Sequence, residues 1–174
     1  MNSNTPPDDT GAAGRIVITP AQITDLTTIL YFIRALAEYE NLTHEVRVTE
    51  DLLRQFLFCD RPAAEVLIAR IDERPAGYAL FFQTYCTFPG RPGIWLEDLF
   101  IYPEYRRSGV GRALMRVIAS ITVQRNCGRL EWSVLDWNEP ALDFYRRIGA
   151  EAMDDWKLLR LTGDSLARLA GSTQ

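Results

Sequence analysis

A short segment rich in glycine and arginine is the part of this chain whose residue types and spacing point most clearly to chemistry. It comprises Arg106, Arg107, Ser108, Gly109, Val110, Gly111 and Arg112. Glycine lets a backbone approach a ligand closely, and arginine supplies positive charge and hydrogen-bond donors. A helix that begins here would add unpaired N–H groups and the positive end of its dipole. The segment therefore predicts an anion site that holds a pyrophosphate mainly through main-chain N–H groups.

The alternative is a tight turn between a strand and a helix that needs glycine only for its geometry. Two other phosphate motifs are excluded. The segment has no Gly-Lys-Ser/Thr, so it is not a Walker loop. It has no Gly-x-Gly-x-x-Gly, and the elements before it do not form a βαβ unit, so it is not a dinucleotide fingerprint.

The elements that must position this segment follow from hydrophobic periodicity and from turn residues. The predicted strands are 15–19, 65–71, 77–85, 94–102, 129–135 and 156–161. The predicted helices begin near residues 21, 51, 109, 138 and 164 and end near residues 41, 58, 126, 148 and 170. The order of elements is β-α-α-β-β-β-α-β-α-β, which predicts an α/β (α+β) fold with a mixed sheet. We expect a disordered leader over residues 1–14 and a single domain over residues 15–174.

Composition excludes several classes of function. The 174 residues are 47% hydrophobic and 24% charged with a net charge of -4, which is typical of a globular protein and not of a nucleic-acid binder. No apolar run is long enough to span a membrane. Three widely spaced cysteines and a single histidine, His44, give no metal-ligand cluster and no disulfide framework. The cysteines favour reduced thiols in a cytoplasmic setting.

Two motifs resemble those of the GNAT N-acetyltransferase family. Leu99-Phe100-Ile101, followed by residues 106–112, resembles its acetyl-CoA motif, and residues 137–150 (Trp-Asn-Glu-Pro-Ala-Leu-Asp-Phe-Tyr-Arg-Arg-Ile-Gly-Ala) resemble its second motif. Residues 35–40 (Ala-Leu-Ala-Glu-Tyr-Glu) and 95–100 (Trp-Leu-Glu-Asp-Leu-Phe) are similar to the diamine (spermidine/spermine) and thialysine N-acetyltransferase branch. The resemblance covers about residues 15–170.

The resemblance implies an acetyl-CoA-dependent enzyme without a metal. It implies a splayed, mostly antiparallel sheet in which the strand holding Leu99, Phe100 and Ile101 parts from the strand 129–135 and admits the pantetheine arm. Main-chain groups of Leu99 and Ile101 would pair with that arm, and residues 106–112 would wrap the pyrophosphate. Further cofactor contacts would come from Asn138, Pro140, Ala141 and Tyr145. A homodimer is also implied.

The reaction implied is attack of an amine on a thioester. An alkyl amine has a pKa near 10.4, so only about one molecule in a thousand is neutral at pH 7. A base is needed, and Glu97 is the residue that the resemblance indicates. The alternative is an edge carboxylate paired with an arginine. Asp98, the residue after Glu97, would point to the opposite face if the strand is regular. The departing thiolate needs a proton, for which the resemblance indicates Tyr145; the alternative is a core aromatic of its helix.

The acceptor is the less determined half of the reaction. Tyr39, Glu40, Glu97 and Asp98 match substrate-contacting positions of the resembling branch, whereas an exposed Glu at a helix end is more often only solvated. Cys86 stands where polyamine-acetylating members carry an Asp, which weakens the case for a long polycation. We therefore expect a small-molecule amine as partner: a diamine, polyamine or lysine-like amino acid. A protein lysine or N-terminus, and a non-catalytic acyl-CoA-binding regulatory module, are the alternatives.

Overall fold

The computed structural model describes residues 14–171. The chain divides into two compact units, one ending at Ser133 and the other beginning at Val134. The expected leader lies outside the described residues, apart from Gly14, which precedes the first strand. Within residues 14–171, no helix is long and apolar enough to cross a membrane.

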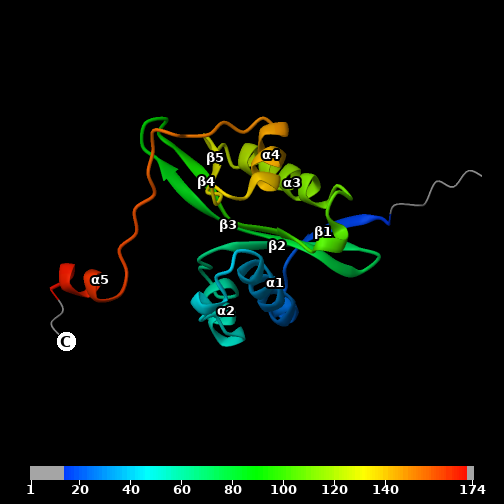
Figure 1. Cartoon of the computed structure of the whole chain (residues 1–174), viewed down its shortest axis with the longest axis horizontal. Coiled ribbons are helices and arrows are strands. Elements are labelled where there is room, and N and C mark those ends of the chain that lie inside the picture. Colours follow the sequence, from blue (N-terminus) through cyan, green and yellow to red (C-terminus); the bar gives the residue numbers. More distant parts are fainter. Residues whose placement is uncertain (1–13, 172–174) are drawn as a thin grey trace, which may run out of the picture. The chain divides into compact units, whose positions relative to one another are not determined.

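The first unit is built on a five-stranded sheet in the order β1-β2-β3-β4-β5 (Figure 1). The strands are β1 (Ile16–Pro20), β2 (Glu65–Ile71), β3 (Arg74–Cys86), β4 (Arg91–Ile101) and β5 (Leu130–Trp132). The pairs from β1 to β4 are antiparallel, and β5 joins β4 in parallel. The predicted mixed, mostly antiparallel sheet is therefore confirmed.

Three α-helices cover the two faces of this sheet. Helices α1 (Leu26–Tyr39) and α2 (Glu50–Leu57) lie on one face, and α3 (Val110–Gln124) lies on the other (Figure 1). Thr49 caps α2, because its hydroxyl accepts a hydrogen bond from the Leu52 N–H at 3.3 Å. Short 3-10 turns precede or follow these helices at Ile23–Asp25, Thr43–Glu45 and Pro103–Tyr105.

An aromatic cluster joins α1 to the sheet. The ring of Phe32 stacks on the ring of Tyr78, with centroids 5.0 Å apart and an angle of 11° between planes. Phe100 and Tyr102 complete the cluster at centroid distances of 6.5 and 4.9 Å from Phe32. Phe32 and Tyr78 are both 0% exposed. Burial of each such ring contributes on the order of 2 kcal/mol to the free energy of unfolding. The cluster therefore fixes the position of α1 against the strands β3 and β4.

Strand β4 is irregular at Glu97. Asp98 pairs with Leu80 and Leu96 pairs with Phe81, so Glu97 is an extra residue in the β3–β4 ladder. Such a bulge changes the phase of side-chain alternation. The expectation that Asp98 points to the face opposite Glu97 held for a regular strand, and β4 is not regular at this point.

The second unit contains α4 (Glu139–Arg147) and α5 (Gly163–Leu169). Asn138 caps α4, since its side chain accepts a hydrogen bond from the Ala141 N–H at 3.4 Å. Gly149, with φ 91°, follows the end of that helix.

The strand predicted over Trp156–Leu161 is not formed. These residues are coil, and Trp156 and Leu159 are 73% and 88% exposed. A strand requires a partner for its N–H and C=O groups, and the described elements of this second unit are the two helices α4 and α5. The apolar pattern of this segment predicted a strand, but a local pattern does not specify a neighbouring strand with which to pair.

Candidate active site

The glycine- and arginine-rich segment forms the turn into α3. Gly109 is the N-cap residue of α3 and has a left-handed backbone, with φ 92°. Arg107 is also left-handed, with φ 66°. Left-handed residues in a turn can direct neighbouring N–H groups toward one side, which creates a concave anion site. The first N–H groups of α3 add to it, because no helix can pair them internally.

The three arginines of this segment are placed differently. Arg106 folds back, with its guanidinium 4.6 Å from the centroid of the Tyr39 ring and its Nε donating to the Ile101 carbonyl at 3.2 Å. Arg107 and Arg112 are exposed, and within residues 14–171 neither forms an ion pair. Two cations therefore remain available for an anion, while Arg106 connects the segment to the end of α1.

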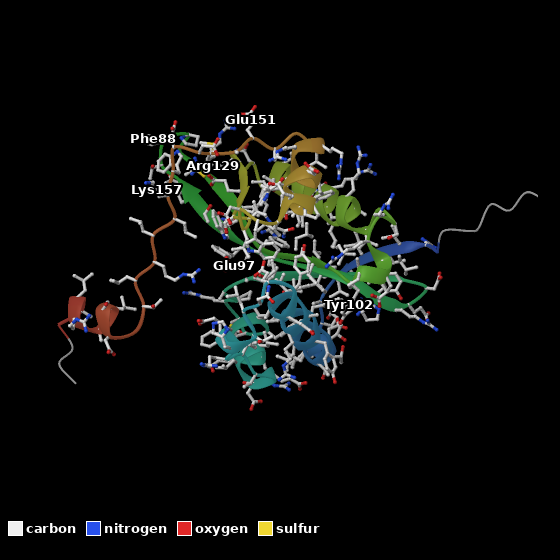
Figure 2. All side chains as sticks on the ribbon, viewed as in Figure 1. Phe88, Glu97, Tyr102, Arg129, Glu151 and Lys157 are labelled. Carbon is white, nitrogen blue, oxygen red and sulfur yellow. The ribbon has the colours of Figure 1, made fainter. Side chains whose placement is uncertain are left out.

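The pairing between β4 and β5 ends just before the bulge. The last register pair is Leu96 with Trp132, so the part of β4 from Glu97 to Ile101 has no β5 partner in the described sheet. Figure 2 labels Glu97, where this open stretch begins, and Tyr102, the first residue after the end of β4. An unpaired strand edge offers main-chain donors and acceptors to an extended ligand. The opening lies where the family resemblance implied that the two strands part.

The bulge brings two carboxylates to one face of the sheet. Trp95 and Asp98 pair with Phe82 and Leu80, which lie on the same face of β3 because they are two residues apart. The Trp95 indole N–H donates to a Glu97 carboxylate oxygen at 2.8 Å, so Glu97 also lies on this side. This is the face that carries α1. Glu97 is thus held by an indole N–H, and among residues 14–171 no arginine forms an ion pair with it, which is what the alternative required.

A third carboxylate, Glu40, completes an acidic cluster that we define as Glu40, Glu97 and Asp98. Burial, and next the charge of Asp98, raise the pKa of Glu40. Burial raises the pKa of Asp98, the hydrogen bond from Tyr78 lowers it, and the charge of Glu97 raises it. In the described part of the chain, no Lys or Arg forms an ion pair with these three residues. Such an arrangement favours the arrival of an external cation.

The residues of the second motif belong to the second unit. Asn138 is buried and caps α4, while Pro140 and Ala141 lie in its first turn. Tyr145 is half-buried, with its ring centroid 5.3 Å from that of Phe144. The functional roles expected of Asn138 and Tyr145 stay predictions.

Two residues next to the acidic cluster were not singled out by sequence analysis: Trp95, which holds Glu97, and Tyr78, whose hydroxyl donates to Asp98 at 2.7 Å. Their types gave no signal, since an aromatic residue in a strand is usually core. The β3–β4 register would have identified Tyr78, because it lies two residues from Leu80, the partner of Asp98.

A group of three or more His, Cys, Asp or Glu that could hold a metal ion is not present among residues 14–171. The thiols of Cys59, Cys86 and Cys127 are free, and Cys86 is buried.

Comparison with known proteins places this geometry in context. The family model described as Acetyltransferase (GNAT) family matches residues 33–150. A thialysine N-epsilon-acetyltransferase of Bos taurus is 35% identical over 167 residues, covering 90% of this chain and 98% of that protein. An L-ornithine N5-acetyltransferase of Arabidopsis thaliana is 31% identical over 210 residues, covering 94% and 92%. Among solved structures, an integron cassette protein of V. cholerae has a TM-score of 0.75 at 25% identity, covering 89% of this chain and 97% of that one.

Proposed function

The chain belongs to the acetyltransferase (GNAT) family, whose acetyl donor is acetyl-CoA, and we propose that it acetylates a primary amine of a small cationic molecule. The acceptor class is a diamine, a polyamine or a lysine-like amino acid. The observation that carries this proposal is the acidic cluster of Glu40, Glu97 and Asp98, with which no Lys or Arg of residues 14–171 forms an ion pair. The relatives that act on thialysine and ornithine support it, since both names describe small amino acids with a side-chain amine.

Bound acetyl-CoA would supply an acetyl thioester that an amine nitrogen attacks. The residues fit this donor. Arg107, Arg112 and the first N–H groups of α3 would hold its pyrophosphate, and the open edge of β4 around Leu99 and Ile101 would hold its pantetheine arm. The Ile101 carbonyl already accepts from Arg106, and a carbonyl oxygen has a second lone pair for another donor.

The chain's own carboxylates would bind the acceptor and take its proton. Asp98 and Glu40 would hold the ammonium of the acceptor in place. Glu97 would then accept its proton, directly or through a water. Tyr145 would hold a proton on its hydroxyl for the departing sulfur, because a phenol with a pKa near 10 can protonate a thiolate.

A thiol-release assay with acetyl-CoA tests this proposal. The amine panel contains thialysine, ornithine, lysine, putrescine, spermidine and a lysine-bearing peptide. We expect release with one or more of the free amines and a higher KM for the amine in Glu97→Gln. Glu104→Gln, an exposed acid just beyond β4, is the matched control and should leave kcat and KM unchanged. Release with the peptide alone would indicate a protein acetyltransferase. Binding of acetyl-CoA without release over the whole panel would indicate a regulatory module.

Two further expectations stay predictions. The free thiols support a reducing, cytoplasmic location. The homodimer that the family resemblance implies is tested by analytical ultracentrifugation of the full chain.

A further inference from the structure

The hydroxyl of Tyr78 links the aromatic cluster to the acidic cluster. The Tyr78 side chain is 0% exposed, and its ring stacks on Phe32. Its hydroxyl donates to Asp98 Oδ2 at 2.7 Å. A phenylalanine at position 78 would pack equally well against Phe32. The hydroxyl therefore has no packing role and acts through its contact with Asp98.

A buried hydroxyl destabilises a protein unless it forms a hydrogen bond. In this molecule the bond goes to a carboxylate at the functional site and not to a backbone carbonyl of the core. A hydrogen bond to a charged partner is shorter and stronger than one between neutral groups. It also occupies one oxygen of Asp98 and thereby restricts the rotation of the carboxylate, which leaves Oδ1 for another ligand.

We propose that Tyr78 is a positioning residue that orients the Asp98 carboxylate toward the acceptor amine. This inference rests on the proposed function, in which Asp98 binds that amine. Tyr78 itself is buried below the acid and need not touch the substrate. The stack on Phe32 holds the phenol ring in place, and the phenol holds the acid.

The electrostatic surroundings explain why Asp98 needs this bond. Glu97 on β4 and Glu40 at the end of α1 bring negative charge from two sides, and Tyr78 supplies a donor from β3. Burial and Glu97 raise the pKa of Asp98, while the Tyr78 bond opposes both. Removing the hydroxyl leaves the two raising effects unopposed. Asp98 then stays protonated to higher pH and cannot hold an ammonium there.

The test is Tyr78→Phe in the full-length protein, assayed as kcat/KM for the amine against pH. The acidic limb of the profile should move upward by about one pH unit, because a single hydrogen bond to a charged group is worth about one unit of pKa. KM for acetyl-CoA should not change. Tyr102→Phe is the matched control: it removes a hydroxyl from the same aromatic cluster, and Tyr102 contacts Phe32 at 4.9 Å between centroids. Its profile should coincide with that of the unmodified protein.

A measurement independent of activity accompanies the assay. A ¹³C NMR titration of the aspartate carboxyls gives the midpoint of Asp98, identified by the signal that is missing in Asp98→Asn. The midpoint should rise in Tyr78→Phe and stay constant in Tyr102→Phe. Superimposed pH profiles together with an unchanged midpoint would overturn the role of Tyr78, even if the enzyme acetylates amines. If the unmodified protein acetylates no amine, the proposed function fails, and the NMR midpoint alone decides whether Tyr78 controls Asp98.

Discussion

Replacing Gly109 by alanine tests whether the turn into α3 depends on a left-handed backbone. An added Cβ would have Ile16 Cδ1 as its nearest neighbour at 3.9 Å, an ordinary contact, so no clash contributes. The backbone has φ 92°, where an L-residue costs about 1–2 kcal/mol. The smaller conformational freedom of the unfolded chain offsets part of this, by about 0.4–1 kcal/mol. The net loss is about 1 kcal/mol, which lowers the Tm of a chain of 174 residues by about 2–4 °C.

Thermal unfolding followed by circular dichroism measures this change, and Gly111→Ala is the matched control. Gly111 lies in the first turn of α3 with a helical backbone, so alanine should leave the Tm unchanged or raise it. CoA affinity, measured by calorimetry, should fall in Gly109→Ala, because the strained turn no longer directs its N–H groups to one side. A Tm for Gly109→Ala equal to or above that of the unmodified protein would refute the argument.

Three further predictions concern the proposed chemistry. Tyr145→Phe should lower kcat at least tenfold with little change in CoA affinity, as general acids typically contribute 10²–10⁴-fold; unchanged turnover would contradict the assignment. Replacing Arg107 and Arg112 together by alanine should weaken CoA binding and reduce its salt dependence, whereas an unaltered salt dependence would show that these cations do not contact the pyrophosphate. Glu40→Gln should raise the Tm at neutral pH while raising KM for the amine. The sign follows because the pKa of Glu40 is raised on folding, so its ionised form destabilises the fold at neutral pH. That gain should vanish as the pH falls below the ordinary range of glutamate, and Glu38→Gln, which changes an exposed acid in the last turn of α1, is the matched control.

The sequence by itself determined most of the local elements, including the turn that we propose for the acetyl donor. The turn into α3 and the caps at Thr49 and Asn138 were predictable because each depends on residues within a few positions of one another. The β2 strand was also predicted with its observed bounds, since its apolar run is closed by turn residues. Short-range signals of this kind are read directly from the chain.

The tertiary structure decided which carboxylates meet at the place where we propose that the acceptor binds. Asp98 lies on the same face of β4 as Glu97 only because the bulge at Glu97 shifts the β3–β4 register there. The Tyr78 hydroxyl reaches Asp98 for the same reason. The segment Trp156–Leu161 shows the opposite outcome, in which a strand-like sequence is coil within a unit whose described elements are the helices α4 and α5. Strand pairing joins residues that are far apart in the chain, so which side chains meet across it is not encoded by any local pattern.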